Sequence, residues 1–85
     1  MHPVSTALFI LGYALALPIA FRMSAVVAGQ HRAALAGHQI GVVVALLGWL
    51  LTGRIWMVIF HALWLLVSRL WFIWGASRAS SQAAT

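Results

Sequence analysis

Hydrophobic residues along the chain form three long runs that are separated by two short polar breaks. The runs cover residues 4–28, 33–52 and 55–74. At about 1.5 Å per residue, a helix of about 20 residues reaches roughly 30 Å, which matches the hydrocarbon thickness of a bilayer. The pattern therefore predicts an all-α membrane protein with three transmembrane helices, which form one helical domain over residues 1–74.

Two of the predicted spans contain residues that interrupt a plain apolar helix. Pro18 lies inside the first run and removes one backbone hydrogen bond, so we expect a kinked first helix that bends near Ala14. His38 and Gln39 lie near the start of the second run, and the apolar stretch that follows them is too short to cross a bilayer by itself. The second segment crosses fully only if these two polar residues lie near the interface.

The chain must turn between the second and third runs. A straight helix of about 40 residues would extend about 60 Å, twice the hydrocarbon thickness. Gly53 and Arg54 separate the two runs, and we expect a tight helical hairpin there. After Trp74, residues 75–85 are small and polar with little to bury, which is typical of a disordered tail.

Small residues recur every three or four positions in the first two runs, so each helix would present one smooth face. In lipid, such faces let two helix backbones approach closely, and this contact is a main source of association energy. The faces could pack this chain's own helices together or bind another subunit. The residues concerned are Gly12, Ala16 and Ala20 in the first run and Gly37, Gly41, Ala45 and Gly48 in the second.

The third run combines an aromatic face with a histidine at membrane depth. The aromatic residues on that face are Trp56, Phe60, Trp64, Trp71 and Trp74. His61 is a functional candidate because ionisable side chains are rare inside membranes. With Trp64 it could bind a haem, a chlorin or a quinone, although a hydrogen bond between helices is the simpler role. A shared haem with His38 is disfavoured, because His38 would lie about 24 Å from the turn and His61 about 10 Å.

The charged residues are few and all of one sign. Five arginines give the formal charge of +5, and the sequence contains no Asp or Glu. Counter-charges must therefore come from outside the chain, either from anionic lipid headgroups or from carboxylates of another subunit. Single arginines between apolar runs do not form the basic face that nucleic acid requires, so we expect no nucleic-acid partner.

Lipid or anion contacts are expected at basic residues near the span ends. These residues are Arg22, Arg32, His38, Arg54 and Arg69. His38 and Arg69 each lie about 15 residues from the turn, so we expect them to lie at one depth and to share a lipid phosphate or another anion.

Arginine placement also predicts the orientation of the chain, because positive charges in short loops stay in the cytoplasm. Arg22, Arg32, Arg69 and Arg78 fall on one side of the predicted membrane and Arg54 on the other. This favours a cytoplasmic C-terminus and an outside N-terminus. The first run lacks the basic start of a signal peptide, so we expect it to be retained. The composition favours the inner membrane of a bacterium.

The residue types that most membrane chemistry requires are missing. The sequence has no Cys, Asp or Glu, which removes thiolate metal sites, carboxylate acid–base pairs and the carboxylate used in ion-driven transport. We therefore expect no enzyme activity, no metal site and no soluble substrate.

These observations favour a small accessory, structural or assembly subunit of a larger respiratory or photosynthetic membrane complex, with a part in electron transport. Its expected partners are other membrane subunits and anionic lipids. In size and span count the chain resembles the small accessory subunits of bacterial respiratory oxidases. Two alternatives stay open: a self-associating holin-like or regulatory membrane protein, and a subunit that binds haem, chlorin or quinone through His61.

Overall fold

The computed structural model describes residues 3–84 of the chain, with side chains for residues 3–78. Over this range the backbone forms four helices and no strand: α1 (Pro3–Ala20), α2 (Met23–Ala28), α3 (Arg32–Thr52) and α4 (Ile55–Ala84). Three segments are long and apolar enough to cross a membrane, namely Pro3–Ala20, Arg32–Thr52 and Ile55–Arg78. The prediction of an all-α chain with three such helices is confirmed, and the second run forms one uninterrupted helix of 21 residues.

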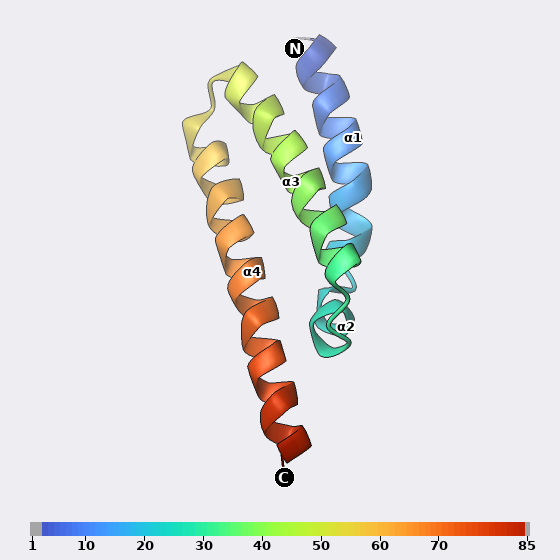
Figure 1. Cartoon of the computed structure of the whole chain (residues 1–85). Coiled ribbons are helices and arrows are strands. Elements are labelled where there is room, and N and C mark those ends of the chain that lie inside the picture. Colours follow the sequence, from blue (N-terminus) through green and yellow to red (C-terminus); the bar gives the residue numbers. More distant parts are fainter. Residues whose placement is uncertain (1–2, 85) are drawn as a thin grey trace.

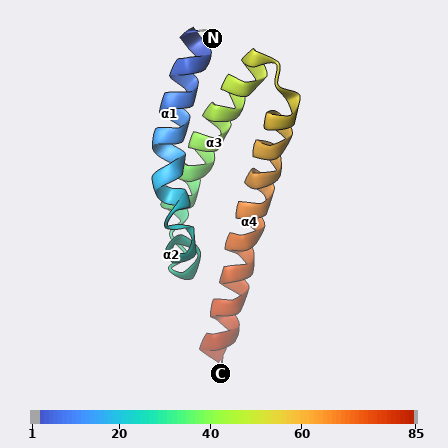
Figure 2. The same cartoon turned by 180° about the vertical axis from the view of Figure 1, so that it is seen from behind.

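The helices form an elongated bundle in which α3 packs against both α1 and α4 (Figure 1). The two views agree that the N-terminus and the turn between α3 and α4 lie at one end, while α2 and the C-terminal part of α4 lie at the other (Figures 1 and 2). The bundle measures 54 × 21 × 15 Å along its principal axes. We call these ends the turn end and the α2 end.

Close backbone contact between α1 and α3 is the tightest packing in the structure. A Cβ atom added at Gly12 would lie 2.6 Å from the backbone nitrogen of Ala45 and 2.6 Å from the carbonyl oxygen of Gly41. The reverse also holds, because a Cβ atom at Gly41 would lie 2.7 Å from the carbonyl oxygen of Gly12. Ala16 and Ala45 are buried in the same contact. The predicted small faces therefore pack this chain's own helices together.

The remaining small positions lie around this contact. The ring of Phe9 covers Gly48, with its Cε1 atom 2.7 Å from where a Cβ would be. Gly37 lies farther along α3, where a Cβ would meet only the side-chain ends of Ile19 and Leu15, at 3.6 Å and 3.9 Å. Ala20 is half-buried at the end of α1.

The first predicted span is divided in two, which corrects the expectation of one kinked helix over residues 4–28. The backbone stays helical through Ala14 and is interrupted at Phe21 and Arg22, after Pro18. There the amide of Arg22 bonds three residues back to the carbonyl of Ile19, at 3.0 Å, which tightens the turn.

The interruption has a packing consequence, because it turns the apolar face of α2 toward α4. Met23, Val26 and Val27 are buried in a cluster with Leu35 and Phe72, whereas Phe21 and Arg22 stay exposed. If α1 continued straight, these side chains would not face α4. Their burial against α4 stabilises the fold and offsets the cost of interrupting the helix.

Two chain reversals end α2 and α3, and both have the Schellman hydrogen-bond pattern. At the end of α3, Gly53 is left-handed with φ 76°, its amide bonds to Leu50, and the Arg54 amide bonds to Trp49. At the end of α2 the left-handed position is occupied by Gln30, with φ 52°. A glutamine is strained there, and its side chain offsets the strain by donating to the carbonyls of Val27 at 2.8 Å and Phe72 at 3.2 Å.

The segment after Trp74 is helical rather than irregular. We expected residues 75–85 to form a disordered tail, but α4 continues to Ala84, and Thr85 lies outside the described residues. The sequence of this segment explains the difference, since it contains no Pro and is rich in Ala, and extending an existing helix costs little. Gly75 lies inside the helix, where the side chain of Val27 occupies the space that a Cβ would need.

The α1–α3 contact predicts that alanine substitutions at different glycines have very different effects on stability. Gly12→Ala or Gly41→Ala would push a Cβ into helix backbone, which cannot move cheaply, so each should destabilise the fold by roughly 1–3 kcal/mol. Gly37→Ala is the matched control and should be neutral or stabilising, because alanine is the better helix former. Unfolding by sodium dodecyl sulfate in mixed micelles, followed by circular dichroism, measures the difference. Equal stability of the Gly12 and Gly37 variants would contradict the described contact.

Candidate functional site

Polar side chains inside the bundle form two hydrogen-bonded networks, and each network joins α1, α3 and α4. The first is centred on Tyr13 of α1 and the second on His38 of α3. The Tyr13 network contains Tyr13, Trp49, His61 and the carbonyl of Met57, and the His38 network contains His38, Trp64 and the carbonyl of Ala16.

In the Tyr13 network the hydroxyl group of Tyr13 is the centre. The indole nitrogen of Trp49 donates to this oxygen at 2.8 Å, and the hydroxyl donates to Nε2 of His61 at 2.7 Å. The other ring nitrogen of His61 donates to the carbonyl of Met57 at 2.7 Å, one turn back in α4. Because a carbonyl only accepts, the proton of His61 lies on Nδ1, and Nε2 is the acceptor.

In the His38 network the imidazole bridges two helices. Trp64 donates its indole N–H to Nε2 of His38 at 2.7 Å, and Nδ1 of His38 donates to the carbonyl of Ala16 at 2.8 Å. An indole N–H can only donate, so Nε2 must carry a lone pair and the ring is neutral. The side chain is 1% exposed. Both buried histidines thus have every ring nitrogen occupied.

A small cavity of about 180 Å³ lies between the two networks and is lined entirely by apolar surface. His61 and Trp64, the two predicted cofactor residues, both line it, together with Phe60, Tyr13 and His38. The structure therefore brings the candidates together. The volume is below the roughly 300–1,000 Å³ of typical small-molecule sites, and a metal could reach Nε2 of His61 only after Tyr13 moves away.

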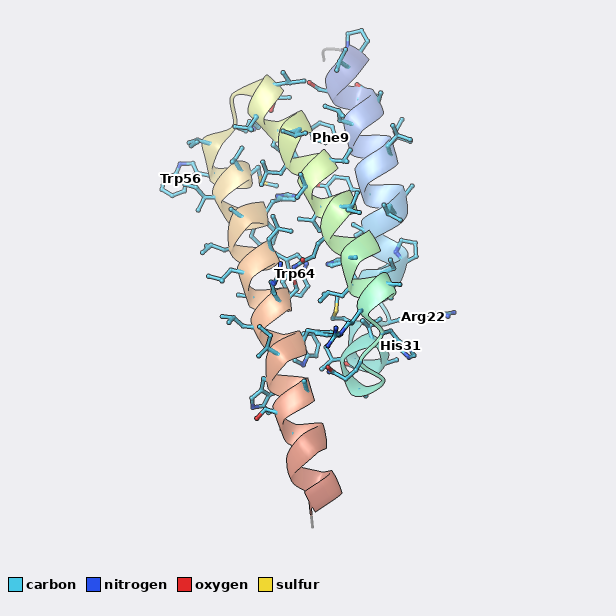
Figure 3. The ribbon with its side chains drawn as sticks, in the orientation of Figure 1. Phe9, Arg22, His31, Trp56 and Trp64 are labelled. Atoms are coloured by element: carbon cyan, nitrogen blue, oxygen red, sulfur yellow. The ribbon has the colours of Figure 1, made fainter. Side chains whose placement is uncertain are left out.

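The aromatic face predicted on α4 is divided between inside and outside. Trp56 is 79% exposed and points away from the bundle, whereas Trp64 points inward between the helices (Figure 3). Trp71 packs against the cluster around Phe72, and Trp74 is exposed beneath the guanidinium of Arg78, which lies 4.8 Å from its ring centroid. These tryptophans do not form one wall for a planar ring.

The arginines predicted to contact lipid or anions are all exposed, but they lie in different places. Arg54 lies at the turn end, and Arg22 points outward from the break between α1 and α2 (Figure 3). Arg32, the first residue of α3, and Arg69 of α4 line the same groove on the outer surface of these helices.

The predicted pairing of His38 with Arg69 is wrong. His38 is buried and faces α1 and Trp64, so it is not available to a lipid or an anion. Successive residues of a helix point about 100° apart, and it is the neighbour, Gln39, that lines the groove with Arg69. The Gln39 amide donates to the carbonyl of Leu65 at 3.0 Å and to the hydroxyl of Ser68 at 3.3 Å.

Sequence reasoning missed three of the polar residues that join the helices. Tyr13, Trp49 and Gln39 were not expected to take part in any site, although each carries a polar group inside a predicted span. Such groups must find partners inside the protein because lipid offers none. That requirement was the available signal, and it points to residues that connect helices.

Comparison with protein-family models, with curated proteins and with solved structures gives no match. The function must therefore be inferred from the residues of this chain.

The His38 network predicts a measurable coupling between α3 and α4. His38→Phe and Trp64→Phe each remove one partner of the same hydrogen bond, so the double variant should lose less stability than the sum of the single losses. The expected coupling is about 0.6–1.7 kcal/mol, the range of hydrogen bonds between membrane helices. Unfolding in mixed micelles measures it. Trp56→Phe, at an exposed position, is the control and should show no coupling with His38→Phe; equal coupling at both tryptophans would contradict the network.

Proposed function

We propose that this protein crosses the bilayer three times, with its N-terminus outside and its C-terminus in the cytoplasm, and acts as a non-catalytic accessory or assembly subunit of a larger membrane complex. Respiratory and photosynthetic complexes are the proposed hosts, with the inner membrane of a bacterium as the location.

The apolar surface of the bundle supports membrane insertion. Large hydrophobic side chains are exposed along all three long helices, with Leu11 65% and Trp56 79% exposed. A surface this apolar is unfavourable in water and is covered at no cost by lipid chains or by other membrane subunits. By contrast, polar side chains that face inward bond to groups on neighbouring helices, as do those of Tyr13, Trp49, His61, Trp64 and Gln39.

One observation carries the proposed subunit role. The two buried networks hold α1, α3 and α4 together, while the arginines with described side chains are exposed and the sequence contains no Asp or Glu to pair with them. We therefore assign the binding of partner subunits to the outer surface, which carries the positive charge and the exposed apolar helix faces. A chain arranged in this way contributes contacts to an assembly rather than a reaction centre.

The alternative of a self-associating holin-like protein loses its main support. That reading required free small-residue faces to pair identical copies, but Gly12, Ala16, Gly41 and Ala45 are occupied by the contact between α1 and α3. The cofactor alternative is likewise weakened, because both ring nitrogens of His61 are hydrogen-bonded.

The proposed topology can be tested by cysteine labelling, because the natural sequence contains no cysteine. Thr52→Cys, at the exposed turn end, should react with a membrane-impermeant maleimide in intact cells. Ser77→Cys, near the α2 end, should react only after the membrane is opened. Labelling of both positions in intact cells would contradict three crossings, and the opposite pattern would invert the orientation.

The subunit role predicts stable association with other membrane proteins. A tagged copy at native expression level, extracted in a mild detergent and purified by affinity, should migrate on a native gel at a mass far above its own 9.2 kDa plus detergent. The bands should contain a defined set of other membrane subunits by mass spectrometry. A chain that migrates alone, or only with copies of itself, would overturn the proposed role.

A further inference from the structure

Two adjoining grooves follow the outer surface between α3 and α4. The larger, of about 550 Å³, is lined mainly by aliphatic side chains, among them Val43, Val44 and Leu66. We call it the apolar groove. The second, of about 420 Å³, is lined by Arg32 and Arg69 among others, and we call it the basic groove. Ala36, Gln39 and Arg69 line both, so the two grooves are continuous.

Positive charge gathers at the α2 end of this surface. Arg32 and Arg69 come from different helices, both are exposed, and no acidic residue exists anywhere in the sequence to neutralise them. The planar guanidinium groups match the oxygens of a phosphate well. The N-terminus of α3 adds to this preference, since it begins at Arg32 and His31 gives it no side-chain cap.

The order of polarity along the surface is that of a phospholipid. Arg32 lies about 30 Å along α3 from the turn and Arg69 about 22 Å along α4, while the aliphatic residues of the apolar groove lie closer to the turn and hence nearer the bilayer centre. From the α2 end toward the turn end, the surface therefore presents two guanidinium groups, then the amide of Gln39, and then aliphatic side chains. The sides of the two grooves are held together, because Gln30 and Gln39 both donate hydrogen bonds to backbone carbonyls of α4.

We propose that this surface binds one anionic phospholipid, with its phosphate between Arg32 and Arg69 and an acyl chain in the apolar groove. The site rests on the proposed membrane insertion but not on the proposed subunit role. Charge complementarity selects an anionic headgroup over a zwitterionic one, and the proposed orientation places the arginines in the cytoplasmic leaflet, where anionic lipids attract basic residues. A free phosphate would use the basic groove alone.

Native mass spectrometry of the purified full chain tests the site, with phosphatidylglycerol and phosphatidylcholine as the probes. The wild-type protein should retain one phosphatidylglycerol molecule in preference to phosphatidylcholine. Arg32→Gln and Arg69→Gln should each weaken retention about fivefold, the factor that corresponds to about 1 kcal/mol for one arginine near an anionic surface. Arg54→Gln makes the same charge change at the turn end, outside both grooves, and should leave retention of the lipid at this site unchanged.

A second variant separates a lipid from an anion. Val43→Trp adds bulk at an exposed position of the apolar groove without changing the charge, and should weaken phosphatidylglycerol retention while circular dichroism stays that of the wild type. Millimolar inorganic phosphate should not displace the lipid.

Three results would overturn the proposal. Equal losses for Arg54→Gln and Arg69→Gln would mean that only overall charge matters. Displacement by inorganic phosphate, with no effect of Val43→Trp, would mean an anion site without a lipid. Absence of retained lipid in the pure protein, with loss of a co-purifying acidic subunit in Arg69→Gln, would assign the arginine to a protein partner. The first two results do not depend on whether the chain migrates within a complex.

Discussion

The contact between the backbones of α1 and α3 is the constraint on which the rest of the structure depends. The carbonyl oxygen of Gly41 lies 2.6 Å from where a Cβ of Gly12 would be, and that of Gly12 lies 2.7 Å from where a Cβ of Gly41 would be, so the two backbones pack directly against each other. Without a hydrophobic drive between helices in lipid, such contact stabilises through dispersion and weak Cα–H···O interactions that larger side chains would prevent. It also fixes the rotation of α1 relative to α3.

The fixed rotation of α1 explains how α4 is held. α1 and α4 do not contact each other closely through their backbones, and the connection between them is made by side chains. Tyr13 reaches from α1 to His61, and His38 of α3 joins the carbonyl of Ala16 to Trp64. Tyr13 and Ala16 lie within the turn of α1 that follows Gly12, next to the contact with Gly41, so the packing of small residues positions the hydrogen bonds. Dispersion places α1 against α3, and polar bonds together with the apolar cluster around Phe72 then hold α4.

Much of the fold could be predicted because hydropathy and small-residue spacing depend only on local sequence. The three long helices, the hairpin at Gly53 and the small faces follow from such local signals. The division of the first run did not, since the break at Phe21 and Arg22 is stabilised by the burial of Met23, Val26 and Val27 against Phe72, a contact between distant parts of the chain. The helical continuation after Trp74 was not predicted, because a small and polar composition is typical of disorder, whereas an existing helix extends at little cost.

The candidate site was harder to predict than the fold, because depth along a helix does not define direction around it. His38 and Arg69 lie at similar distances from the turn, yet the side chain of His38 points into the bundle while that of its neighbour Gln39 lines the outer groove between α3 and α4. The packing of α3 between two helices decides which face each residue occupies. Spacing within one helix contains no information about that arrangement until the partner helices are known.

The two buried networks have a consequence for the energised membrane in which such a chain would reside. Each begins at an indole N–H, which gives up no proton at physiological pH, and each ends at a backbone carbonyl, which takes none. A proton wire needs groups at both ends that exchange with water. These networks have closed ends, so in the proposed three-span arrangement two histidines and a tyrosine would lie inside the bilayer without forming a proton wire.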